Sequence, residues 1–160
     1  MDAVGKILEQ WNRERPDLDV GPMGLLGRLA RLRNHLRRET DAEFARHGLS
    51  SSSFDVLATL RRSGAPYRLS PSELMETMMI TSGTMTNRID QLEKAGMVER
   101  LDNPDDRRGV IIALTDKGFD TVDKAVTGHV ANQHRLVSAL SDDEANQLNA
   151  LLGKFLAAYE

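Results

Sequence analysis

The chain has 160 residues, a formal net charge of -3 and no cysteine. This length suffices for one domain with its own hydrophobic core, and the lack of cysteine excludes disulfides, thiolate metal ligands, thiol nucleophiles and cysteine redox switches. There is no signal-peptide pattern at the start and no apolar run of the roughly 20 residues that span a membrane, so we expect a cytoplasmic protein that makes no membrane contact.

The first half of the chain is predicted to be helical. Apolar residues at helical spacing indicate a short helix within residues 1–15, which Pro16 ends. A second helix is expected over residues 23–47, with a leucine stripe on one face and arginines around the rest. Gly48 is expected to end it, and a serine then caps a helix that carries Phe54, Val56, Leu57 and Leu60.

A helix-turn-helix is predicted next. The sequence SPSE at 70–73 matches a capping box with proline at the first helical position, and it opens a short helix after the loop RSGAPYRL. Thr81 is the expected cap of a second helix, whose narrow apolar face consists of Met85, Ile89 and Leu92. Two short helices joined by a tight turn form a helix-turn-helix.

After Gly96 the apolar period changes from 3.6 to 2. MVERL, the polar turn DNPDDRRG and VIIALT predict a β-hairpin with Val110, Ile112 and Leu114 on one face. Thr115 is expected to cap a long helix to about residue 140, and the capping box SDDE at 141–144 opens a last helix. The fold class is therefore mainly α with a small β-hairpin wing. This order of elements is that of a winged helix-turn-helix flanked by long helices.

The helix that follows Thr81 begins with TSGTMT, a run of small polar residues with little to bury. Backbone N–H groups at a helix N-terminus and short hydroxyl side chains suit contacts with DNA phosphates and base edges. Asn87 is suited to an adenine edge, although a well-capped surface helix has the same composition.

The run from Leu69 to Gly118 resembles the MarR family of dimeric bacterial transcription regulators. The resemblance lies in the recognition helix TSGTMTNRIDQLE, the strand GMVER, the DRR wing and the return LTDKG. It implies a single domain over 1–160, with an extra N-terminal helix at 1–15, dimerisation helices at 23–47 and 115–160, and a winged-helix DNA-binding region at 50–114. It also implies a homodimer on a pseudopalindromic operator in double-stranded DNA. The expected DNA-binding residues are Thr81, Ser82, Thr84, Thr86 and Asn87 of the recognition helix and Arg107 and Arg108 of the wing.

A finer resemblance is to the urate-responsive branch of this family. It is carried by the N-terminal helix with ILEQW, the pair FD at 54–55 and the arginines of TNRI and VER, and it implies a ligand set of Trp11, Asp55, Arg88 and Arg100. Each residue also has a purely structural interpretation: an apolar anchor for Trp11, an interhelical ion pair for Asp55 with Arg88, and an exposed strand charge for Arg100. The resemblance implies a repressor released from its operator by urate or a related purine.

Three alternatives stay open: a response to phenolic or other aromatic compounds, a winged-helix module that binds proteins without specific DNA binding, and a monomer whose long helices close over the core. An enzyme is not expected. Phosphate loops and nucleophile elbows are missing, and His129 and His134 are five residues apart, whereas a helical metal pair stands at i and i+4. We therefore expect no cofactor, no metal and no catalytic residue.

Overall fold

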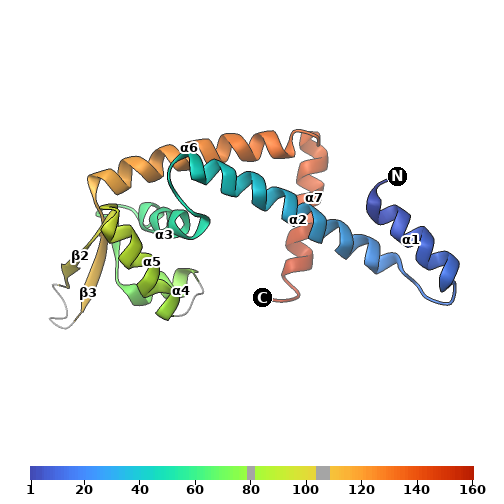
Figure 1. The fold of residues 1–160 in the computed structure, drawn as a ribbon, viewed down its shortest axis with the longest axis horizontal. Coiled ribbons are helices and arrows are strands. Elements are labelled where there is room, and N and C mark those ends of the chain that lie inside the picture. Colours follow the sequence, from blue (N-terminus) through green and yellow to red (C-terminus); the bar gives the residue numbers. More distant parts are fainter. Residues whose placement is uncertain (79–81, 104–108) are drawn as a thin grey trace. The chain divides into compact units, whose positions relative to one another are not determined.

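The computed structural model describes residues 1–78, 82–103 and 109–160. The chain divides into two compact units, Met1–Thr40 and Asp41–Glu160, with the boundary inside the long helix α2 (Figure 1). Among the predicted DNA-binding residues, Thr81, Arg107 and Arg108 lie outside the described residues, as does the side chain of Ser82.

The N-terminal unit contains helix α1, Ala3–Glu14, and the first part of α2, Gly21–Arg46. Asp2 caps α1, because its Oδ1 accepts a hydrogen bond of 2.7 Å from the Gly5 backbone N–H. The carboxylate also pairs with Arg28, and this bond lowers the pKa of Asp2. Val4 is buried, whereas Trp11 is 43% exposed, so α1 uses only part of its apolar stripe within this unit.

The second unit contains the five remaining helices. They are α3, Ser51–Arg62; α4, Pro71–Met78; α5, Ser82–Lys94; α6, Asp116–Val137; and α7, Asp142–Leu156. The apolar faces of α3, α4, α5 and α6 meet in one core with the sheet. The largest side chains that this core buries completely are Leu57, Leu60, Leu74, Met85 and Ile112. The predicted apolar face of α5 is confirmed, because Met85, Ile89 and Leu92 are all buried.

The wing has three strands. Strand β2, Val98–Asp102, pairs antiparallel with β3, Val110–Leu114, and β3 also pairs with β1, Arg68–Leu69. The sequence analysis assigned residues 68–69 to a loop, because a two-residue strand is too short to show a period. Of the expected inner face of β3, Ile112 is buried while Val110 is 39% exposed.

The predicted caps that fall within the described residues are confirmed. The Ser70 N–H donates to the Glu73 carboxylate at 2.7 Å and the Glu73 N–H donates to the Ser70 hydroxyl at 3.3 Å. Ser141 and Glu144 form the same reciprocal box, and Gly48 ends α2 with a φ of 69°. In both boxes the serine holds the pKa of the glutamate below its usual range.

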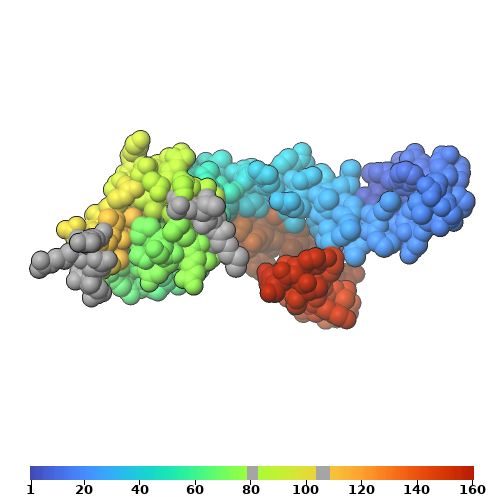
Figure 2. Space-filling view, turned by 90° about the horizontal axis from the view of Figure 1, so that it is seen from below, coloured from blue at the N-terminus to red at the C-terminus, as the bar shows by residue number. Residues whose placement is uncertain are grey.

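Helix α7 buries no residue within the unit, and Figure 2 shows its surface uncovered. The apolar side chains that it exposes include Leu148, Leu151, Leu152, Phe155 and Leu156. No helix in the described residues is long and apolar enough to cross a membrane.

Gly118 fixes the junction between α6 and the strand that follows α5. A Cβ atom at this position would lie 1.9 Å from the backbone oxygen of Met97. That distance is far below van der Waals contact, and the obstacle is main chain rather than a side chain that can turn away. Only glycine therefore allows α6 to begin so close to Met97.

We expect Gly118→Ala to lower the free energy of unfolding by about 1–3 kcal/mol, because the added methyl group forces α6 away from Met97. The control is Gly83→Ala in α5, where an added Cβ meets no atom within 4 Å. Urea unfolding followed by circular dichroism measures both. Equal unfolding midpoints for Gly118→Ala and the natural chain would show that the close contact is wrong.

Candidate functional site

Helix α5 has a buried side and an exposed side. One side is buried in the core through Met85, Ile89 and Leu92. The opposite side is exposed and carries Asn87 and Gln91, whose side chains lie together, with the Gln91 amide donating to Asn87 Oδ1 at 3.4 Å. Thr84 and Thr86 are also exposed, near the start of the helix. The N-terminal half of α5 therefore offers short polar side chains and neutral amides to a partner.

One flank of α5 is held by the wing. Arg100 of β2 forms ion pairs with Asp90 and Glu93 of α5. The hydrogen bond that Arg100 donates to Asp90 and the negative charge of Glu93 raise the pKa of Arg100. The sequence analysis offered Arg100 as a ligand residue or as an exposed strand charge, and the structure places it as a link between β2 and the recognition helix.

The C-terminal end of α5 is held by the start of α6. The Thr115 hydroxyl donates to the Gly96 carbonyl and the Lys117 ammonium donates to the Ala95 carbonyl, each at 2.7 Å. These carbonyls belong to the turn that directly follows α5. The sequence analysis identified Thr115 as a cap of α6 but missed that it also holds α5.

The other flank of α5 faces α3. Asp55 of α3 is exposed at the surface of the unit, yet its neighbours remove enough hydration to raise the pKa of its carboxyl group. The charges of Arg88, Arg62 and His129 oppose this rise. The charge of Arg88 on α5 therefore acts on the Asp55 carboxylate of α3. Arg62 and His129 were not predicted as neighbours of Asp55.

His129 packs against the aromatic core, and its charge also acts on Asp55. Its ring lies 5.0 Å from that of Phe44 and 5.4 Å from that of Phe54, measured between centroids. Its Nδ1 atom is buried and has no hydrogen-bond partner in the described part of the chain. A buried ring nitrogen without a partner is unusual, since burial of a polar atom costs free energy that a hydrogen bond normally offsets.

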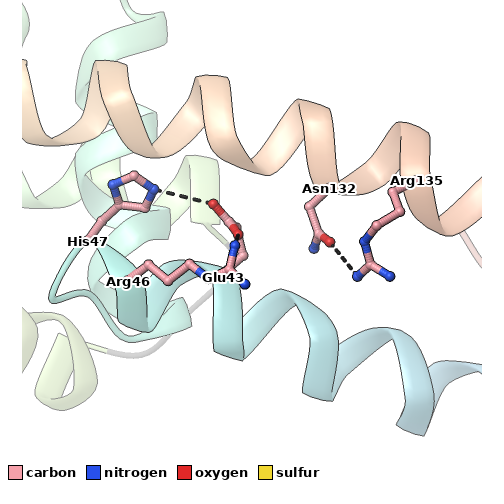
Figure 3. Close-up of polar contacts among 5 residues, drawn as sticks. All are labelled: Glu43, Arg46, His47, Asn132 and Arg135. Carbon is pink, nitrogen blue, oxygen red and sulfur yellow. Dashed lines mark hydrogen bonds and ion pairs between the residues drawn. The ribbon is translucent and has the colours of Figure 1, made fainter.

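A second polar cluster lies beside it, where the end of α2 meets α6 (Figure 3). The buried Glu43 carboxylate accepts from Arg46 at 3.0 Å and lies 3.4 Å from His47 Nε2. Gly128 makes this approach possible, because a Cβ there would lie 2.4 Å from Glu43 Oε1. On α6, Arg135 donates to Asn132 at 2.8 Å. Because Glu43 has both a charged partner and a histidine, we interpret this cluster as structural.

Trp11 belongs to the N-terminal unit, and its position beside Asp55, Arg88 and Arg100 stays a prediction. Within the described residues, no group of three or more His, Asp or Glu side chains is arranged to hold a metal ion.

Comparisons with known proteins agree with this geometry. The MarR family profile matches residues 49–110. The regulator PecS from Dickeya dadantii is 46% identical over 151 residues, which are 94% of this chain and 91% of that protein. The multiple antibiotic resistance protein MarR of Escherichia coli K12 is 31% identical over 134 residues, 82% of this chain and 90% of that protein.

Among solved structures, a cysteine-to-serine mutant of E. coli MarR bound to operator DNA superimposes with a TM-score of 0.71 at 26% identity. The match covers 91% of this chain and 97% of that one. These relatives are regulators rather than enzymes, and the winged-helix fold predicted from the sequence is confirmed. The chain is a DNA-binding transcriptional regulator of the MarR family.

Proposed function

We propose that this regulator is a cytoplasmic, dimeric repressor that leaves a pseudopalindromic operator when it binds a planar, anionic, nitrogen-rich molecule such as urate or a related purine. The observation that carries the ligand part is that the charge of Arg88, on the recognition helix, acts on the partly desolvated carboxylate of Asp55 on α3. The identity to PecS over most of both chains supports the placement in one branch of the family.

The DNA-binding part rests on the exposed side of α5. Thr84, Thr86 and Asn87 lie there without any carboxylate among them, and Arg100 pairs with both acidic residues of α5, Asp90 and Glu93, which offsets part of their negative charge. A surface that approaches a phosphate backbone gains from such neutralisation, because an unpaired carboxylate would repel the DNA. Two copies related by a two-fold axis would place one α5 in each of two half-sites about one helical turn apart.

The ligand part rests on the electrostatic environment of the Asp55 carboxylate. Desolvation disfavours its charged form, and Arg88, Arg62 and His129 surround it with cationic or protonatable groups. The carboxylate can accept hydrogen bonds from ring N–H groups, and the guanidinium groups attract an anion. Together they suit an anionic heterocycle that carries ring N–H donors. Trp11, which is exposed within its own unit, would supply the flat apolar surface.

The release step follows from the position of Arg88. An anion that draws the Arg88 guanidinium toward Asp55, or that the Asp55 carboxylate repels, acts on α5 through the flank next to α3. The far flank of α5 is tied to β2 through Arg100, so this force tilts the helix relative to the wing instead of moving both together. Arg100 could then join the ligand set by exchanging a helix carboxylate for the ligand anion. Ligand and operator oppose each other by linkage.

The dimer part rests on apolar surface at the two ends of the chain. Helix α7 exposes five large apolar side chains, and α2 exposes Leu25, Leu26 and Leu32. Contiguous apolar surface of this kind is typically covered by a partner, and a second copy is the usual one.

For the operator, we expect selection from random double-stranded DNA to return a pseudopalindrome with half-sites about 10 base pairs apart, centre to centre. Arg108→Ala should weaken binding to every sequence and reduce the salt dependence, because it removes one cation from the wing that we expect to meet the DNA. Asn87→Ala should instead relax the preference at one base pair per half-site.

Gel-shift or anisotropy titrations at several salt concentrations separate these effects. If the natural chain selects no common sequence, the chain acts as a winged-helix interaction module and not as an operator-binding regulator. If both variants bind like the natural chain, the DNA-facing side is misassigned.

For the ligand, we expect urate to quench the fluorescence of Trp11, the single tryptophan, and to release operator DNA over the same concentration range. Arg88→Ala should abolish the release. Asp55→Asn should weaken the response and leave the protein equally or more stable, because it removes a carboxylate whose desolvation disfavours its charge.

Glu99→Gln, an exposed charge change on β2, is the control. Release by salicylate without any response to urate would assign the site to phenolic acids. If millimolar urate neither quenches Trp11 nor releases DNA, the urate assignment is wrong.

For the dimer, we expect sedimentation equilibrium at micromolar concentration to give twice the chain mass. Leu151 is 65% exposed, so Leu151→Glu should leave the fold of the protomer intact but shift the equilibrium to monomer. Asn149→Glu introduces the same charge at a nearby exposed position and should remain a dimer. A natural chain that sediments as a monomer contradicts the dimer.

A further inference from the structure

The exposed side of α5 carries two neutral amides next to each other. Asn87 and Gln91 are both exposed, and the Gln91 amide nitrogen donates to Asn87 Oδ1 at 3.4 Å. Residues four apart on a helix lie one above the other on the same face. The buried side of the helix, with Met85 and Ile89, points in the opposite direction.

The distance between the two positions matches the spacing of base pairs. Four residues rise about 6 Å along a helix axis, and successive base pairs are about 3.4 Å apart. When α5 lies along a major groove with Asn87 against one base pair, Gln91 therefore reaches the base pair one or two steps further on.

The hydrogen bond between the amides decides which groups face the DNA. Because Asn87 Oδ1 accepts from Gln91, the Asn87 NH₂ group remains available as a donor, and the Gln91 carbonyl remains available as an acceptor. In the major groove, guanine and thymine oxygens accept hydrogen bonds, while adenine and cytosine amino groups donate them. The bond is long, so a base that offers a better partner can turn either amide.

The surroundings favour readout of bases over contact with phosphates at these two positions. The carboxylates of Asp90 and Glu93 lie on the flank of α5 and are held there by Arg100. Neither amide carries a charge that phosphates would attract, and neither lies near the helix N-terminus, where backbone N–H groups bind phosphate.

We infer that Gln91 is a specificity-determining residue, which reads a base pair adjacent to that of Asn87 and sets the orientation of the Asn87 amide, so that the two side chains read the operator as one coupled pair. This inference rests on the proposed binding of an operator. It adds a residue that the recognition helix uses to read the operator.

The experiment is a parallel selection of bound DNA by the natural chain and by Gln91→Ala, Asn87→Ala and the double variant, followed by affinity measurements on the selected operator and its single-base changes. Gln133→Ala, an exposed glutamine on α6, is the matched control.

We expect Gln91→Ala to lose at least about 5-fold of discrimination at one base pair per half-site, one or two steps from the position lost in Asn87→Ala. It should also change the preference at the Asn87 position, and the double variant should lose less than the product of the two single losses, because the amides act together. Gln133→Ala should keep every preference.

If Gln91→Ala selects the same operator with the same discrimination as the natural chain, the inference is wrong but the proposed function is unaffected. A loss of affinity that is equal for all sequences also overturns it, because it assigns Gln91 to the backbone. If the natural chain selects no operator, the proposed function itself is wrong. Circular dichroism of each variant establishes that the helix is folded.

Discussion

The position of the recognition helix depends on how its C-terminal half is held. Arg100 of β2 pairs with Asp90 and Glu93 on one flank. Thr115 and Lys117, at the start of α6, donate to the carbonyls of Gly96 and Ala95 in the turn after α5. Gly118 allows α6 to come this close. These contacts fix the C-terminal half of α5 to the wing and to α6.

Electrostatics connects α5 to the ligand site that we propose. The carboxylate of Asp55 is disfavoured by desolvation and favoured by Arg88, Arg62 and His129. Such a balance is sensitive to one added negative charge, because an anion competes with Asp55 for the same cations. Since Arg88 belongs to α5, a change in this balance acts directly on the helix that binds DNA.

Much of the fold follows from local sequence signals. The capping boxes at Ser70 and Ser141, the glycine at 48 and the apolar face of α5 each rest on a few neighbouring residues, and each is confirmed. Strand β1 escaped prediction because two residues have no period, and its pairing with β3 depends on residues more than forty positions away.

The site was predictable only in part, because its contacts also join residues that are far apart in the sequence. Asp55 and Arg88 entered through resemblance, and the electrostatic effect of Arg88 on Asp55 depends on how α3 and α5 pack. No spacing rule connects His129 to Asp55, or Arg100 to Glu93, because these pairs form between elements that only tertiary packing brings together. Gln91 was overlooked for a different reason: a single exposed glutamine carries no signal until its contact with Asn87 is seen.

The central claim is that ligand and operator compete through one helix, and reciprocity tests it most directly. The affinity for urate is measured by Trp11 fluorescence with and without saturating operator, and the operator affinity is measured with and without saturating urate. The account predicts that each ligand weakens the other by the same factor, since linkage requires it, and that Arg88→Ala brings both factors to one. A urate affinity that is unchanged by operator DNA would contradict the account.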